Sequence, residues 1–168
     1  MRYYPAAIAL SLLVAVTASV GQARETAPAD PRVSALLASG QSRLSAGDTE
    51  GAIGLFESAL ALDPGHAGTY IALGDAERSA GMPGKAIHYF REALSRDPNN
   101  LAAISGEGEA LADKGAIDRA KGNLARLEGL CGKSCGEVQA LTSAIARGPL
   151  PRVVAADTVK PEPKVESN

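Results

Sequence analysis

The segment AIGLFESALALDP at residues 52–64 returns 34 residues later as AIHYFREALSRDP at 86–98. The two copies share an alanine, an isoleucine, a phenylalanine, an Ala-Leu pair and a closing Asp-Pro. The same step leads on to Ala120, where the pattern continues with aliphatic residues. A fixed period of this length predicts a stack of repeated units, each of which buries its apolar face against its neighbours.

Each unit is expected to fold as two helices joined by a turn. An Asp-Pro pair should end the second helix of the first two units, because the residue before proline is disfavoured in the helical conformation. Glycine ends a helix in the left-handed conformation at little cost, and one glycine per unit separates two helical patterns: Gly47, Gly81 and Gly115. A second set lies inside the first helix, where glycine costs about 1 kcal/mol relative to alanine: Gly40, Gly74 and Gly108. Its repetition predicts close helix contacts there, with Phe56 and Phe90 filling the space.

This pattern resembles the tetratricopeptide repeat, a 34-residue helix–turn–helix unit with Leu-Gly in its first helix, then alanine, phenylalanine and a closing proline. The middle unit carries the matching residues Tyr70, Leu73, Gly74, Ala86, Phe90 and Pro98. The first and third units match less fully, and Gly132 stands where the third closing proline belongs. The resemblance implies an all-α fold, a right-handed α-solenoid of three helix pairs whose first helices line a protein-binding groove.

An export signal is expected at the N-terminus. Arg2 precedes an uncharged apolar run from Ala6 to Val20, and small residues stand at Gly21 and Ala23, the positions that a signal peptidase reads. We expect cleavage after Ala23, with Ala18 as the second choice and an uncleaved membrane anchor as the alternative. Residues 1–23 are then the signal peptide, and the protein is periplasmic in a bacterium, or secreted otherwise. The run is shorter than the ~20 residues of a spanning helix, so no stable membrane insertion is expected after cleavage.

The remaining boundaries follow from composition and periodicity. Residues 24–32 are short, polar and proline-containing, which is typical of a linker. The solenoid covers 33–148, with repeats at about 33–66, 67–100 and 101–132. Val138, Leu141 and Ile145 share one stripe of a capping helix at 136–147. Residues 149–168 hold four prolines and no period, and they predict a disordered tail.

Positions one period apart should lie side by side in the groove that the resemblance implies. One such row contains Gln41, Asp75 and Glu109, with Arg78 beside it. Its acidic character predicts a basic or amine-bearing protein or peptide partner; a plain solvated face is the alternative. The row lacks the lysine, arginine and asparagine residues of the family's carboxylate-clamp subclass, so that activity is not expected. A net charge of -2 gives no reason to expect a nucleic-acid partner.

Cys131 and Cys135 are the only cysteines. In an exported protein they are expected to form a structural disulfide between the third unit and the capping helix. Their spacing is one residue longer than in Cys-x-x-Cys redox sites, and no histidine lies nearby for a metal site. His66 and His88 are expected to face solvent. No catalytic residue, cofactor or metal site is predicted.

The sequence thus predicts a non-catalytic interaction scaffold or adaptor. Two alternatives remain open. One is a thiol–disulfide or redox-sensing protein that uses Cys131 and Cys135. The other is a self-assembling envelope protein whose groove is filled by another copy or by residues 153–165 of its own tail.

Overall fold

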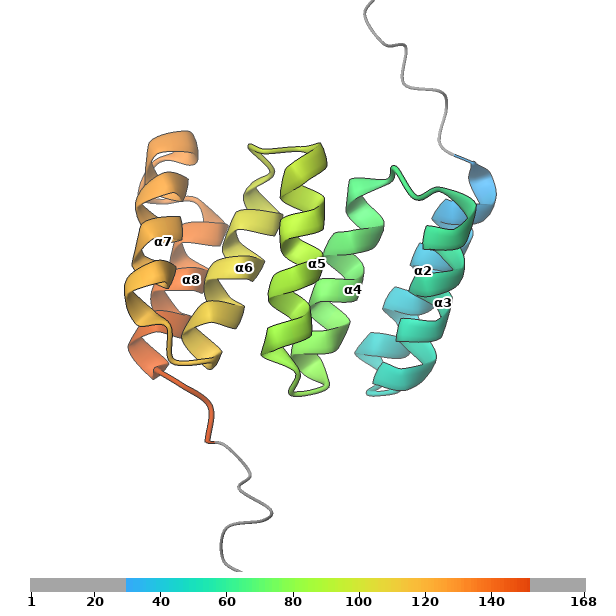
Figure 1. The fold of residues 1–168 in the computed structure, drawn as a ribbon, viewed down its shortest axis with the longest axis horizontal. Helices are drawn as coiled ribbons and strands as arrows, with labels where there is room; N and C mark the ends of the chain where they lie inside the picture. Colours follow the sequence, from blue (N-terminus) through green and yellow to red (C-terminus); the bar gives the residue numbers. More distant parts are fainter. Residues whose placement is uncertain (1–29, 152–168) are drawn as a thin grey trace, which may run out of the picture. The chain divides into compact units, whose positions relative to one another are not determined.

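The computed structural model describes residues 30–151, and these form seven helices with no strand among them (Figure 1). The predicted all-α helical solenoid is therefore confirmed. The expected signal peptide, residues 24–29 of the expected linker and residues 152–168 of the tail lie outside the described part. In chain order the helices are α2 (Pro31–Ser45), α3 (Thr49–Leu62), α4 (Ala67–Ser79), α5 (Pro83–Arg96), α6 (Leu101–Asp113), α7 (Ile117–Cys131) and α8 (Gly136–Arg147).

The helices pair in chain order. The pairs α2–α3, α4–α5 and α6–α7 are the three predicted hairpins, and α8 packs against both helices of the last one (Figure 1). Contacts of α3 with α4 and of α5 with α6 join successive hairpins. The first helices also touch one another, since α4 contacts both α2 and α6. This arrangement places α4, α6 and α8 next to each other along one side of the stack.

The turns use the predicted glycines. Gly47, Gly81 and Gly115 have φ angles of 83°, 74° and 86°, the left-handed region that other residues rarely adopt. Asp63 and Asp97 end α3 and α5 as C-cap residues, each just before a proline. The glycine pattern therefore predicted the turn inside each unit, and the Asp-Pro pairs predicted where α3 and α5 end.

The first helix begins earlier than predicted. We expected a linker over 24–32, but α2 starts at Pro31, two residues before the expected start of the solenoid at Val33. Proline is tolerated in the first turn of a helix, because the backbone N–H that it lacks would have no helical acceptor there. Pro31, which we predicted as part of the linker, is therefore the first residue of α2.

The two phenylalanines are completely buried where helices approach closely. A Cβ on Gly40 would overlap the ring of Phe56, and a Cβ on Gly74 would lie 2.7 Å from the ring of Phe90. The Phe90 ring also faces Gly106 of α6, in the next unit. Gly108, in the third unit, faces Leu141 of the capping helix α8.

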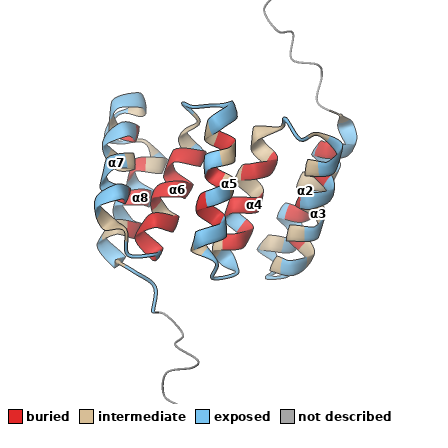
Figure 2. Ribbon diagram, in the orientation of Figure 1, coloured by how far each residue is buried: buried red, intermediate tan, exposed pale blue. Residues whose placement is uncertain are grey.

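Helix α6 is the most enclosed element. It packs against α4, α5, α7 and α8, and Figure 2 shows buried positions along most of its length. Ten of its 13 residues are buried, among them the charged Glu107 and Asp113. Polar groups inside this helix must therefore find partners on neighbouring helices.

The start of the predicted disordered tail is bound to the domain. The backbone N–H of Leu150 donates to the carbonyl of Asp113 at 3.1 Å. This hydrogen bond attaches the segment 149–151 to the α6–α7 turn. The predicted disordered tail, which we began at residue 149, therefore starts too early. No helix in the described range has both the length and the apolar character needed to cross a membrane.

Candidate functional site

A hollow of about 290 Å³ lies on the side of the stack where α4, α6 and α8 meet. It brings together Asp75 and Glu109, two members of the predicted row. Gln41, the third member, is exposed on α2 and does not line this hollow. We call it the α4–α6–α8 hollow; its lining residues are Ile71, Asp75, Ala102, Ser105, Gly106, Glu109, Gly136, Glu137 and Ala140.

Asp75 is an exposed acid at the rim of the hollow. Its carboxylate has no ion-pair partner among residues 30–151. Surrounding protein displaces water from it and, with a smaller contribution from the nearby charge of Glu109, raises the pKa of Asp75 to about 6, although Arg78 acts in the opposite direction. The exposed Asp75 side chain is largely ionised at neutral pH, so a ligand entering the hollow meets its negative charge.

Arg78 has its own partners within the fold. One terminal nitrogen lies 2.8 Å from Glu109 Oε2, and its Nε lies 2.8 Å from Asp113 Oδ2. The other oxygen of Asp113 pairs with Arg147 of α8 at 2.9 Å. The Asp113 side chain is only 1% exposed, so these pairs join α4, α6 and α8 through a buried carboxylate. Arg78 therefore holds the fold together at this point, although we predicted it as part of the binding row.

Glu109 is also fixed in place. Its Oε1 accepts a hydrogen bond from Ser105 Oγ at 3.0 Å, while Oε2 is paired with Arg78. The Ser105 hydroxyl also lies 3.2 Å from the carbonyl of Glu137, at the start of α8. Three carboxylates line the hollow: Glu109 is held in place, whereas Asp75 and Glu137 have no ion-pair partner within residues 30–151. Several of its other walls are alanine or glycine, which leave the backbone open to a ligand.

The two cysteines form a disulfide between the end of α7 and the residue before α8. Their sulfurs are 2.03 Å apart and their Cα atoms 6.0 Å apart. The carboxylate of Glu137 is close enough for these three residues to form a possible metal-ligand set. Metal binding requires thiolates, so the paired cysteines do not supply that set. The disulfide instead fixes the start of α8, which forms one edge of the hollow.

Replacing both Cys131 and Cys135 by serine should lower the stability of the protein without unfolding it. Closing so short a loop stabilises by about 2 kcal/mol in the chain-entropy model, which for a domain of this size corresponds to a melting temperature lower by roughly 5–10 °C. Thermal unfolding followed by circular dichroism measures the change, and reduction of the unmodified protein should reproduce it. An unchanged melting temperature, together with a thiol of low pKa, would instead favour the redox-sensing alternative.

The two histidines differ from each other. His66 is half-buried and caps α4, since its Nδ1 accepts from the backbone N–H of Thr69 at 3.2 Å. This capping role corrects the prediction that His66 faces solvent. Histidine can act as an N-cap because an unprotonated ring nitrogen accepts a hydrogen bond. His88 is exposed on α5, as predicted.

The comparisons with known proteins agree with the geometry. The sequence model of the tetratricopeptide repeat family matches residues 77–145. A search of curated protein sequences finds no match. The family match supports the predicted resemblance over residues 77–145.

Three solved structures illustrate the fold similarity. The Yersinia enterocolitica type III secretion chaperone SycD, in complex with a peptide of the translocator YopD, has 19% identity and a TM-score of 0.61, covering 70% of this chain and 89% of its own. The TPR2B domain of yeast Sti1, in a complex with pHsp70, has 16% identity and a TM-score of 0.63, covering 70% and 98%. An O-GlcNAc transferase mutant from Thermobaculum terrenum has 21% identity and a TM-score of 0.64, covering 71% of this chain but only 23% of its own. At these identities the likeness is one of fold.

Proposed function

Because residues 77–145 match the sequence model of the tetratricopeptide repeat family and the fold is that of solved repeat domains, we propose that this chain is an exported, non-catalytic scaffold whose α4–α6–α8 hollow binds a basic segment of another protein. Repeats of this family are generally protein-binding modules, and the SycD and Sti1 structures contain bound partners. The observation that supports a basic partner is the Asp75 carboxylate, which lies in the hollow beside Glu109 without an ion pair of its own. No catalytic step is proposed.

A lysine side chain is the simplest ligand for this arrangement. Its ammonium group has three donors, enough to reach both Asp75 and Glu109, and hydrogen bonds between charged groups are the stronger class. A bound cation would also favour the ionised form of Asp75 and so oppose the shift that raises its pKa. The alanine and glycine walls of the hollow allow an extended peptide backbone to approach.

Replacing Asp75 by asparagine should weaken binding of a basic peptide by about fivefold or more, which corresponds to about 1 kcal/mol. The probe is a fluorescently labelled peptide of alternating lysine and alanine, and fluorescence anisotropy measures its affinity. The matched control is Asp118→Asn, because Asp118 is exposed in the first turn of α7 and outside the hollow. Equal affinities for the two variants, or equal binding of a glutamine–alanine peptide, would contradict the proposed site.

The pH dependence of the same measurement has a predicted sign. Below its pKa of about 6, Asp75 becomes protonated and loses its charge, so affinity should decline between about pH 7.5 and about pH 5. A bound cation favours the ionised form, which places the midpoint in the complex below that of the free protein. The Asp75→Asn variant should lack most of this dependence.

Export is supported by the residue pattern of 1–23 and by the pairing of Cys131 with Cys135, which suits an oxidising compartment. We expect the mature protein to begin at Arg24. Intact mass spectrometry of protein recovered from the periplasm of an expressing bacterium tests this. A full-length mass, or protein found only in the cytosol, would count against export.

A further inference from the structure

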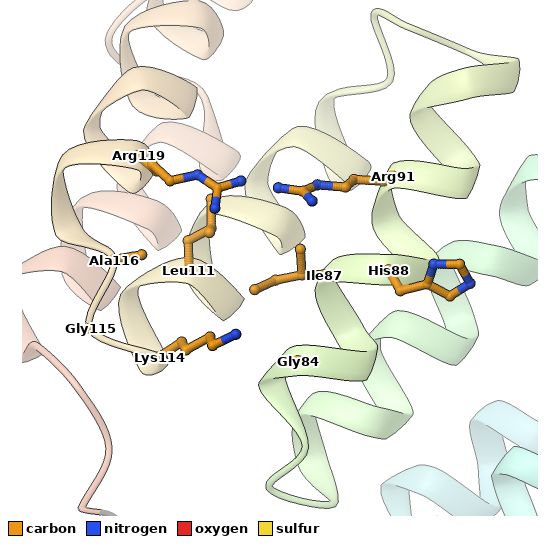
Figure 3. A pocket seen from close by; sticks show the side chains of 9 residues that line it. All are labelled: Gly84, Ile87, His88, Arg91, Leu111, Lys114, Gly115, Ala116 and Arg119. Carbon is orange, nitrogen blue, oxygen red and sulfur yellow. The ribbon is translucent and has the colours of Figure 1, made fainter.

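A second cavity, of about 430 Å³, lies between α5 and the α6–α7 hairpin (Figure 3). It shares no lining residue with the α4–α6–α8 hollow. We call it the basic cleft and define it by the side chains that the argument uses: Ile87, His88, Arg91, Leu111, Lys114 and Arg119.

The charged residues that line the basic cleft all have the same sign. Arg91, Lys114 and Arg119 contribute three cations, and no acidic residue lines the cavity. Within residues 30–151, neither Lys114 nor Arg119 has an ion-pair partner. The chain as a whole carries a net charge of -2, so this local excess of positive charge does not reflect its average composition.

Arg91 is held in position by a buried acid. Its Nε lies 2.8 Å from Glu107 Oε1, and the other oxygen of Glu107 accepts from Asn123 Nδ2 at 3.1 Å. Glu107 is thereby satisfied on α6. The bond to Nε leaves the terminal nitrogens of Arg91 facing the guanidinium of Arg119 across the cleft (Figure 3). Two guanidinium groups that face one another form a natural place for a carboxylate.

The floor of the basic cleft is apolar. Ile87 and Leu111 lie between the two guanidinium-bearing helices (Figure 3), and they are 7% and 2% exposed. Lys114 lies at one end of the floor, and His88 is exposed at the edge on α5. An aliphatic side chain would therefore contact the floor while neighbouring carboxylates reach the cations at the rim.

We propose that the basic cleft is a second docking site, which takes an acidic segment of a partner protein with an aliphatic residue flanked by glutamate or aspartate. This goes beyond the proposed function, because the site is distinct and its ligand has the opposite charge. Charge complementarity is the argument for this occupant: an anionic segment meets three cations, two of them without partners in the described range.

The test uses the purified protein and a labelled hexapeptide, Glu-Leu-Glu-Glu-Leu-Glu, with Gln-Leu-Gln-Gln-Leu-Gln as the uncharged comparison. Fluorescence anisotropy should show saturable binding of the first peptide that weakens as salt is added. The double variant Lys114→Gln/Arg119→Gln should bind about tenfold more weakly, equivalent to ~1.4 kcal/mol. Arg91 is left intact, because removing it would leave Glu107 without its cation. Lys121→Gln is the matched control, since Lys121 is exposed on α7, the helix of Arg119, and does not line the cavity.

Each other outcome decides against the proposal. Absence of saturable binding, equal binding of the two peptides, or an equal loss in Lys121→Gln would overturn the basic cleft as an acidic-peptide site. If the probe binds only after Asp157→Asn, Glu162→Gln and Glu166→Gln are introduced together, the occupant is the C-terminal segment of this chain and no partner is required. Asp75→Asn should leave this probe unaffected, so failure here is separable from failure of the α4–α6–α8 hollow.

Discussion

Replacing Phe90 by alanine is expected to lower the free energy of unfolding by about 3–5 kcal/mol. The ring is completely buried and lies between a glycine of its own unit, Gly74, and a glycine of the next, Gly106. Its loss removes apolar contacts and leaves a cavity that two helix backbones cannot easily fill. Chemical denaturation followed by circular dichroism measures the change. A loss below about 0.5 kcal/mol, the size of a typical surface change, would show that the ring is not the packing element described.

A double-mutant cycle separates this contact from general helix effects. Gly106→Ala alone should destabilise the protein, because a Cβ there overlaps the Phe90 ring, and overpacking a core costs about 1–3 kcal/mol. In the Phe90→Ala background the same change should stabilise, since the clash is gone and alanine is favoured in a helix by about 1 kcal/mol. Gly54→Ala is the control, because Gly54 is helical with open space at its Cβ position. A Gly106→Ala effect of the same sign in both backgrounds would contradict the predicted contact.

Arg78→Gln should lower the free energy of unfolding by about 2–3 kcal/mol, somewhat less than the 3–5 kcal/mol typical of breaking a buried pair. The reason is Asp113, whose carboxylate is almost fully buried and would keep only Arg147 as a cationic partner. Partial exposure of Arg78, at 27% of its side chain, reduces the expected loss. The same denaturation experiment measures it.

An exposed ion pair supplies the comparison for Arg78. Arg43 and Asp48 also lie 2.8 Å apart, but their side chains are 56% and 47% exposed, so Arg43→Gln should cost much less than Arg78→Gln. Combining Arg78→Gln with Asp113→Asn should cost less than the sum of the single changes, with a coupling energy of about 1–2 kcal/mol. Equal losses for Arg78→Gln and Arg43→Gln would mean that the burial of Asp113 has no energetic weight.

The architecture was predictable because its signals are local. Glycine at Gly47, Gly81 and Gly115 and proline after Asp63 and Asp97 act on the backbone conformation of their own positions, so a repeated pattern gives repeated helix ends. The contact of Gly106 with Phe90 has no such signal. Gly106 lies two residues before the glycine at the expected step, and its partner belongs to the preceding unit. Only the stacking of one hairpin on the next brings the two residues together.

The candidate sites were predictable only in part for the same reason. The period places Asp75 and Glu109 next to each other, because equivalent positions on neighbouring first helices are adjacent. The period does not predict the pairing of Arg78 with Asp113, which lies 35 residues further along the chain. The basic cleft had no sequence signal at all, since Arg91 and Arg119 lie on different second helices and are not one period apart.

The enclosure of α6 affects how rigid the two proposed binding sites are before a ligand binds. Amide hydrogens in a helix packed on four sides exchange with solvent only in the rarer, larger openings of a fold. Within residues 30–151 the α2–α3 hairpin touches a single neighbouring unit, so it should open more readily. Both the hollow and the basic cleft take residues from α6. Their shapes are thus set before any ligand arrives, and association should be close to a rigid-body encounter with little entropy lost to ordering.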